Sequence, residues 1–313
     1  MTITAAWVRT LKNCKELVVV TDSRLNGGKK MDCGQKLLTL PRSDAFICFA
    51  GGIDWAYPLM HQVVNAISTY EKSATRAQDI TVLKSHVLKV FDDLLTTVHG
   101  ASGDEGIPSA KFLFGGYSWI RKEFLIWRIH YHVPNLRNPP KSKFEHAKLV
   151  KELSHFVAEP AKTWHGQPWI FSGDEEYEDE ARQRLTKLLH ERGRSPEQVE
   201  NFKFDWEPFE VVRDMLRDVA GDSFKFRNGH IGGAPQVLKV YEHLNARYLG
   251  VEWKKSDGEG RDVYVCGRRT LAYETPMLWI LDPDTLVSRH PYYSAKADEQ
   301  TEQPSSELDV PMV

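Results

Sequence analysis

The stretch MTITAAWV, residues 1–8, and the stretch ELVVVTDSRLNGG, residues 16–28, decide the fold of this chain. Both are rich in Thr, Val, Ile and Trp, which favour the pleated surface of a β-sheet. We therefore predict strands over Thr2–Val8 and Glu16–Thr21. The polar residues between them are typical of a hairpin loop. A strand so close to the start of a chain has to be tied into a sheet, because free ends fray.

Thr2 follows the initiator Met1 directly. Its side chain is small enough for an aminopeptidase to remove Met1, and the mature chain would then begin with a threonine that carries a free amine. Such an α-amine can serve as the base for the hydroxyl of its own residue, which is one of the few ways a threonine becomes a nucleophile. Thr2 is therefore our first candidate catalytic residue.

The rest of the chain groups short strands and pairs of helices. Strands are predicted over Lys36–Pro41, Ala45–Ala50, Lys111–Tyr117, Glu123–His132, Trp169–Phe171, Pro235–His243, Leu249–Trp253, Val263–Cys266 and Met277–Leu281. Apolar residues at helical spacing predict helices over residues 59–70, 82–95, 181–189 and 211–219. A further helix is predicted over Phe144–Val157, within an insert at about residues 134–167.

This order predicts an α+β fold, a four-layer αββα sandwich of two antiparallel sheets, each covered by a helix pair. A parallel, doubly wound sheet would instead need strands and helices to alternate singly. We predict one domain over residues 1–294, with the insert at about 134–167, and a polar, disordered tail over residues 295–313.

The composition argues against several classes of protein. The 313 residues are 41% hydrophobic with a formal net charge of −2, whereas a nucleic-acid-binding surface usually shows a basic excess. No apolar run approaches the roughly 20 residues of a membrane helix, and a secretory signal is not expected. The four cysteines lack CxxC spacing, which predicts isolated, reduced thiols in a cytoplasmic protein.

Several motifs occur in an order that resembles the proteasome β-subunit and its bacterial relatives of the HslV and Anbu types, which are N-terminal-nucleophile (Ntn) hydrolases. After the MT start these motifs are Asp22-Ser23-Arg24, Lys36-Leu37-Leu38, Ala50-Gly51-Gly52, FLFGGYSW, Phe171-Ser172-Gly173 and Ile231-Gly232-Gly233-Ala234. The stretch DSRLNGG is most similar to the Anbu branch. The resemblance covers about residues 2–253, without a counterpart for the insert or for the C-terminal region.

The resemblance implies a role for each of several residues. Thr2 would attack a carbonyl, and Lys36, paired with Asp22, would supply the positive charge that lowers the proton affinity near the nucleophile. Arg24 would hold the loop by hydrogen bonds. The backbone N–H of Gly51 would bind the oxyanion, and Ser172 would lie near the terminal amine.

The resemblance also implies the setting in which these residues act. It implies a ring or stacked assembly of identical subunits, a peptide or protein substrate, and no metal or organic cofactor. It leaves room for a separate unfoldase or operon partner.

A second hypothesis is a catalytically inactive, proteasome-like subunit that acts as a scaffold, sensor or partner-binding protein. The family commonly carries an aspartate and a serine near the turn at Ile231, where this chain has Asn228 and Ile231. In addition, if Ile3 aligns with the usual isoleucine of the family, Met1 falls on the nucleophile position and the site is inactive.

Other patterns have simpler interpretations. His130 and His132 share one strand face, but a zinc site would need further ligands, so we expect surface or core histidines. The tryptophans are expected in the core or at interfaces rather than stacked on nucleic-acid bases. The acidic run that begins at Asp174 complements the dipole of the helix that it starts.

Overall fold

The computed structural model describes residues 2–12, 14–99, 107–135, 142, 153–195, 199–220, 229–255 and 259–292. Within these ranges the chain is a mixed α/β structure with several sheets, in which all but one of the named strand pairs are antiparallel. Three predictions lie outside the described residues: the tail from Ala295, the residue Asn228, and residues 144–152 of the helix expected in the insert.

The larger sheet contains ten strands within the described part of the chain. Its main order is β10 (Lys162–Trp164), β11 (Gln167–Gly173), β1 (Ile3–Thr10), β2 (Lys15–Thr21), β12 (Gln236–Tyr241), β13 (Asn245–Lys254), β14 (Arg261–Val265) and β15 (Arg268–Arg269). In addition, β16 (Ile280–Leu281) pairs with β13, and β17 (Ser288–Arg289) pairs with β16. The predicted hairpin is confirmed as β1 and β2, with Thr4 opposite Thr21.

The smaller sheet contains five strands among the described residues. They follow the order β5 (Leu37–Thr39), β6 (Ala45–Ala50), β7 (Lys111–Ser118), β8 (Glu123–His132) and β9 (His155–Pro160). The helix predicted over Phe144–Val157 is wrong at its end, because His155–Val157 belong to β9. The reason is tertiary: Phe156 is buried against Phe91 and Phe112, and β9 completes its hydrogen bonds along β8.

The short elements that were not predicted from the sequence include a hairpin and a four-residue helix. The segment expected to be only a turn after Thr21 forms a hairpin of β3 (Leu25–Gly27) and β4 (Lys29–Met31). Gly28 joins the two strands with a φ of 82°, a conformation that favours glycine. The four-residue helix α2 (Glu71–Ala74) follows directly after the first long helix.

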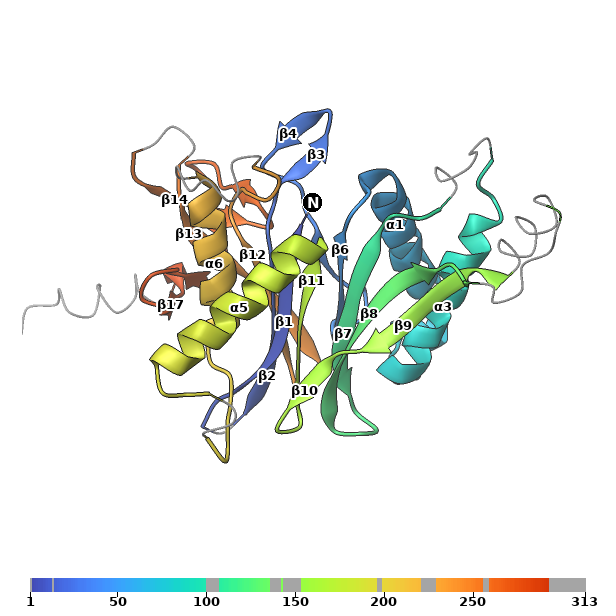
Figure 1. The fold of residues 1–313 in the computed structure, drawn as a ribbon, viewed down its shortest axis with the longest axis horizontal. Coiled ribbons are helices and arrows are strands. Elements are labelled where there is room, and N and C mark those ends of the chain that lie inside the picture. Colours follow the sequence, from blue (N-terminus) through green and yellow to red (C-terminus); the bar gives the residue numbers. More distant parts are fainter. Residues whose placement is uncertain are drawn as a thin grey trace, which may run out of the picture.

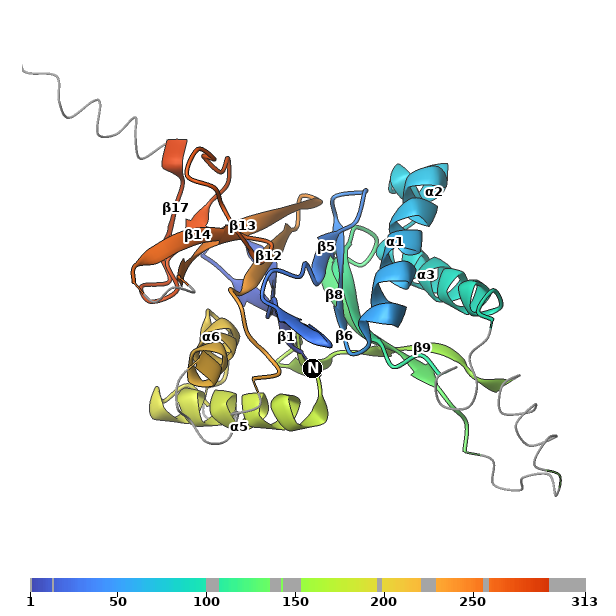
Figure 2. The ribbon, with the colours of Figure 1, turned by 90° about the horizontal axis from the view of Figure 1, so that it is seen from above.

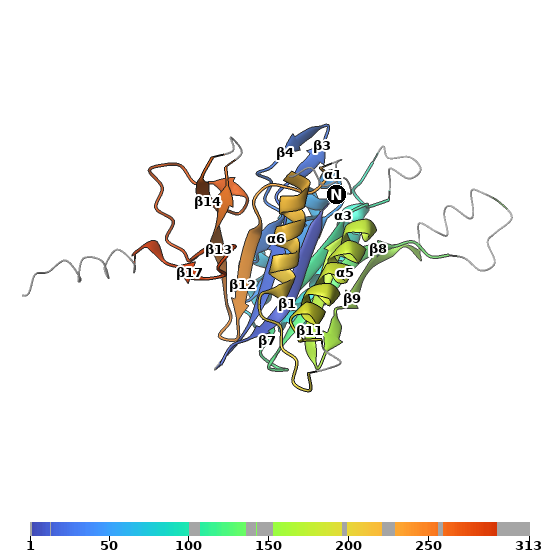
Figure 3. The ribbon, with the colours of Figure 1, turned by 60° about the vertical axis from the view of Figure 1, so that its left-hand side comes forward.

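The four long helices of the described residues lie as two pairs on opposite sides of the strands (Figures 1 and 2). The first pair is α1 (Ile53–Thr69) and α3 (Ile80–Leu95), whose apolar faces share a hydrophobic core with the smaller sheet. The second pair is α5 (Glu175–Glu191) and α6 (Glu207–Ala220), which share a core with the larger sheet. Figure 3 shows this second pair across the strands of that sheet.

A third hydrophobic cluster joins the two sheets directly. It brings Val8 and Val19 of the larger sheet together with Phe46 and Leu113 of the smaller one. Along β1 the side chains alternate between two cores: Ala5 and Trp7 belong to the cluster under α5 and α6, whereas Ala6 and Val8 belong to the cluster between the sheets. This alternation is the expected period of two for a strand that is buried on both faces.

Among the described residues, no helix is both long enough and apolar enough to cross a membrane. The segment at about residues 134–167 contributes β9 to the edge of the smaller sheet and β10 to the edge of the larger one.

Candidate active site

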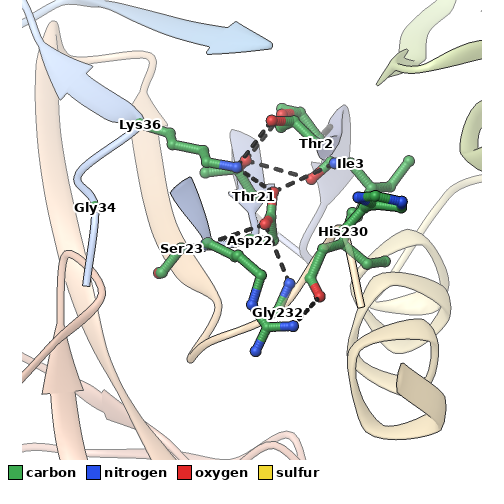
Figure 4. Close-up of polar contacts among 12 residues, drawn as sticks. Thr2, Ile3, Thr21, Asp22, Ser23, Gly34, Lys36, His230 and Gly232 are labelled. Atoms are coloured by element: carbon green, nitrogen blue, oxygen red, sulfur yellow. Dashed lines mark hydrogen bonds and ion pairs between the residues drawn. The ribbon is translucent and has the colours of Figure 1, made fainter. Parts of the chain in front are cut away.

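The side chains of Thr2, Lys36 and Asp22 meet at the ends of β1 and β2 (Figure 4). The Nζ of Lys36 lies 2.8 Å from Oγ1 of Thr2 and 2.8 Å from Oδ1 of Asp22. All three residues are buried, with exposed fractions of 1%, 1% and 0% for Thr2, Lys36 and Asp22. The ammonium of Lys36 therefore bridges a hydroxyl and a carboxylate in a site shielded from solvent.

The strand order explains why these three residues meet. Because β1 and β2 are antiparallel neighbours, the start of β1 lies beside the end of β2, and the backbone N–H of Asp22 donates to the carbonyl of Ile3 at 3.3 Å. Lys36 stands one residue before β5, in the smaller sheet, so its side chain reaches the site from the other sheet. The site is therefore built across the interface between the two sheets.

Asp22 is held by backbone donors as well as by Lys36. Its carboxylate accepts hydrogen bonds from the N–H groups of Ile3 at 3.3 Å, Arg24 at 3.1 Å and Gly232 at 3.2 Å. Complete burial raises the pKa of Asp22, while the charge of Lys36 and the bonds from Lys36, Arg24 and Gly232 act in the opposite direction. These contacts fix the carboxylate in one orientation toward Lys36.

Gln236, which sequence reasoning missed, ties together the two segments that carry Asp22 and Lys36. Its Oε1 accepts from the backbone N–H of Lys36 at 3.1 Å, and its Nε2 donates to Ser23 Oγ at 3.0 Å and to the carbonyl of Gly34 at 2.7 Å. The side chain is completely buried. In the sequence Gln236 is simply the first residue of a strand, so no pattern singles it out.

Asp174 is the second residue that the sequence did not assign to the site. Its Oδ2 accepts a hydrogen bond from the backbone N–H of Thr2 at 2.8 Å. Asp174 stands at the N-cap of α5, where the sequence indicated only an acidic first turn. Its place directly after the motif Phe171-Ser172-Gly173 is the one signal that could have identified it.

The other residues named from the sequence lie around this group. Ser172 is buried in β11 opposite Thr4, one register position beyond the pair of Gly173 and Ile3. Arg24 binds Asp32 with two nitrogens, and its Nη1 donates to the carbonyl of Gly229 at 2.7 Å and of Ile231 at 3.2 Å. Arg24 thus connects the segment after β2 to the turn before β12.

Gly51 ends β6 at the turn into α1. Its φ is 95°, and a side chain there would collide with the backbone carbonyl of Ser109. Glycine is therefore required at this position by the packing of the turn alone. The contacts of Gly51 neither require nor oppose a role in binding an oxyanion.

Two residues from the strands near the end of the larger sheet pack against the same site. Gly267, in the turn between β14 and β15, has a φ of 83°, and a side chain there would collide with Ser23. The hydroxyl of Tyr248 in β13 accepts from the N–H of Thr39 at 2.9 Å and donates to the carbonyl of Leu37 at 3.1 Å. Both contacts support the segments that carry Asp22 and Lys36.

A small polar group continues from the site into the layer between the sheets. The hydroxyl of Thr4 donates to that of Thr21 at 2.9 Å and lies 3.6 Å from Sγ of Cys48. Burial raises the pKa of the Cys48 thiol to about 11, so this thiol is protonated at neutral pH. All four cysteines are free in this structure.

Among the described residues, no cluster of three or more His, Cys, Asp or Glu side chains is arranged to hold a metal ion. His130 and His132 lie in β8, and His130 Nε2 is 3.9 Å from Glu159.

Comparison with known proteins leaves the site to be interpreted from its geometry. A scan against models of protein families finds no match to this chain, and a search of the curated proteins finds no match. The resemblance to proteasome-like hydrolases therefore stays a prediction that rests on the motifs quoted above.

Proposed function

We propose that the chain is an N-terminal threonine hydrolase of the proteasome-like Ntn type, which cleaves peptide or amide bonds after removal of Met1. The observation that carries this proposal is the 2.8 Å contact between the buried Lys36 ammonium and the Thr2 hydroxyl. A positive charge beside a hydroxyl lowers its proton affinity, and Asp22 keeps that charge in place. Burial raises the pKa of Asp22, and a carboxyl group perturbed in this way is typical of functional sites.

The arrangement of the helices and sheets supports the fold that belongs to this proposal. The fold is the four-layer αββα sandwich, in which α5 and α6 cover one sheet and α1 and α3 cover the other. Three hydrophobic clusters support it: one under each helix pair and one between the sheets. A four-layer arrangement buries both faces of each sheet, which agrees with the buried central strands β1, β2 and β6.

The proposed reaction starts when the hydroxyl of Thr2 gives its proton to its own α-amine and its oxygen attacks the substrate carbonyl. The ammonium of Lys36 stabilises the negative charge that develops on the attacking oxygen. The tetrahedral intermediate collapses when the α-ammonium returns the proton to the leaving amine, which leaves an ester on Thr2. Water then attacks this ester, with the α-amine as base, and releases the acid.

The charge on the substrate oxygen also needs a donor. The proposal assigns the backbone N–H of Gly51, at the turn into α1, to this role. Ser172 is assigned a place near the terminal amine, in line with its burial in β11 beside the segment that contacts Thr2. Apart from the substrate and the attacking water, each of these roles is assigned to a group of the polypeptide.

Intact mass spectrometry, before and after treatment with a β-lactone or an epoxyketone, tests the proposal. The expected result is a chain that has lost Met1 and gains one adduct, which peptide mapping places on Thr2. Retention of Met1 together with the absence of an adduct would contradict it. Thr2→Ser is a matched variant that keeps a hydroxyl, whereas Thr2→Val keeps the shape of the side chain and should form no adduct.

An inactive subunit that acts as a scaffold or sensor is the second candidate function. The observation that favours it is Ile231, a fully buried apolar residue in the turn where the family commonly carries a serine. Retained Met1, a chain that stays assembled and an unreactive Thr2 would support this second function. The mass measurement therefore separates the two candidates directly.

We further propose that copies of the chain assemble into a ring or a stack, and that a separate unfoldase or operon partner acts with it. The exposed side chains of Tyr273 and Met277, at 83% and 76%, support an apolar contact surface in the C-terminal region. Light scattering coupled to size-exclusion chromatography tests the assembly. A chain that stays monomeric at micromolar concentration would contradict this part of the proposal.

A further inference from the structure

We propose that Asp174 binds the α-amine of the mature chain and decides when that amine can accept the proton of Thr2. This inference rests on the proposed function, because it concerns the chain after Met1 has been removed. The atom involved is already defined: the nitrogen of Thr2 lies 2.8 Å from Oδ2 of Asp174. Removal of Met1 turns this peptide nitrogen into an amine.

Asp174 stands at the N-cap of α5, but its side chain does not cap the helix. Its residue type and its extended backbone, with φ −79° and ψ 142°, suit the N-cap of α5, yet its side chain makes no capping hydrogen bond. The first turn is instead served by its carbonyl, which accepts from Tyr177 and Glu178, each at 3.0 Å. The carboxylate is thus directed at Thr2 rather than at the helix.

The backbone around Asp174 also binds Thr2. The N–H of Asp174 donates to the carbonyl of Thr2 at 3.3 Å, so the two residues bind each other through two hydrogen bonds. A side chain at Gly173 would collide with that same carbonyl. Gly173 also pairs with Ile3, which ties this turn to the start of β1.

In the turn before β12, Ile231 is fully buried in the core under α5 and α6. Its apolar side chain offers no hydrogen-bonding group to an amine. Among the described residues, Asp174 is the one whose carboxylate accepts from the nitrogen of Thr2. The acidic group that the chain lacks at Ile231 is supplied from the start of α5.

The charges around Thr2 decide the direction of the effect. Asp174 faces its nitrogen, Lys36 faces its hydroxyl, and Asp22 lies behind Lys36. From the flanking elements, Lys111 of β7 donates to the carbonyl of Gly173 at 3.4 Å, while Glu178 and Tyr177 belong to the first turn of α5.

A carboxylate in direct contact with an ammonium favours its charged form, so Asp174 holds the pKa of the amine higher than it would be in the same site without this carboxylate. Because only the neutral amine can take the proton of Thr2, acylation is lost as the pH falls through this pKa.

The experiment uses the full chain, with Thr2 exposed by cleavage of an N-terminal fusion and with ¹³C-methyl-labelled threonine. The methyl signal of Thr2 is followed by NMR as a function of pH, in the wild type and in Asp174→Asn. We expect the pH at the midpoint of this titration to be lower in Asp174→Asn than in the wild type by about one pH unit or more. The pH profile of the β-lactone reaction should move in the same direction by a similar amount.

Two further variants separate the charge of Asp174 from its place in the helix. Asp174→Ser keeps a good N-cap residue without the charge, so it should shift the midpoint as Asp174→Asn does, and it serves if that variant fails to fold. Glu176→Gln removes an exposed negative charge from the same turn and should leave the midpoint unchanged.

The outcomes distinguish this inference from the proposed function. An unchanged midpoint in both Asp174 variants overturns the inference, even if Thr2 forms the lactone adduct and the proposed function stands. A lowered midpoint without any adduct in the wild type supports the binding of the amine by Asp174 and overturns the hydrolase. A lowered midpoint together with a shifted lactone profile supports both.

Discussion

Two buried ion pairs, Arg42 with Asp44 and Lys36 with Asp22, lie close together in the sequence but differ in what the cation contacts. Arg42 binds Asp44 through two bonds, Nε to Oδ1 at 2.6 Å and Nη2 to Oδ2 at 2.9 Å, and both side chains are fully buried. Lys36 binds Asp22 through one oxygen at 2.8 Å and shares its charge with Thr2. The guanidinium of Arg42 forms two bonds to Asp44 and one to the backbone carbonyl of Ser73 at 3.4 Å, whereas the ammonium of Lys36 also contacts a side-chain hydroxyl.

The chemistry of the two cations explains this difference. A guanidinium is planar and matches a carboxylate with two parallel bonds, so it suits a pair that only stabilises structure. An ammonium is a compact charge with three donors, so it can bind a carboxylate and a hydroxyl at once. Burial of an ion pair is therefore not in itself a sign of function. The informative feature is a cation whose spare donor contacts a buried hydroxyl.

The largest expected effect is that of Lys36→Met on the chemistry of Thr2. Without the charge beside its hydroxyl, acylation by a β-lactone should slow by about 10³-fold or more. Time courses of intact mass measure this rate, and circular dichroism checks that the chain remains folded. Thr2 acylated at the wild-type rate in a folded Lys36→Met chain would remove the role assigned to Lys36.

Disruption of the pair formed by Arg42 and Asp44 should lower the stability of the chain and leave the reactivity of Thr2 unchanged. Arg42→Met leaves Asp44 as an unpaired buried charge and should lower the free energy of unfolding by about 3–5 kcal/mol, measured by urea denaturation. The folded fraction should still acylate Thr2 at the wild-type rate. Combining Arg42→Met with Asp44→Leu should recover most of the stability, because no buried charge is left unpaired. A loss of reactivity per folded molecule would show that the two pairs are coupled.

Gln236 offers a smaller perturbation that should act on the lysine pair alone. Gln236→Met removes the acceptor for the N–H of Lys36, and we expect acylation to slow by about tenfold, since displacement of a reacting group by ~1 Å costs up to 10²-fold. The dependence of the rate on lactone concentration separates acylation from lactone binding. Gln35→Met is the control: Gln35 Nε2 donates to the carbonyl of Leu37 at 3.3 Å, and its loss should leave the rate unchanged.

The smallest expected effect is that of Arg42→Lys. The lysine keeps the charge but cannot form both bonds to Asp44, so stability should fall by about 1 kcal/mol, the net contribution of one hydrogen bond. Thermal unfolding followed by circular dichroism measures the change. A loss as large as that of Arg42→Met would mean that the shape of the guanidinium, rather than its charge, stabilises this turn.

The strands and helices of the core could largely be predicted from local patterns. The spacing of apolar residues located α1, α3, α5 and α6, and Asp79 was expected near the start of α3, where its carboxylate caps the N–H of Thr81 at 3.1 Å. Burial outweighed the local pattern at Phe156, whose segment became β9 instead of a helix. The hairpin of β3 and β4 was missed because its turn residues give no alternating apolar signal.

The sequence by itself determined the strands that open the chain and the presence of Thr2, Asp22 and Lys36, because alternating side chains and short motifs are local properties. Only the tertiary structure decided that Asp174 and Gln236 belong to the same site, since they lie 172 and 200 residues from the groups they bind. Hydrogen bonds over such separations leave no periodic trace in a sequence. They follow from the packing of β11 and β12 beside β1 and β2, which is set by hydrophobic burial across two sheets.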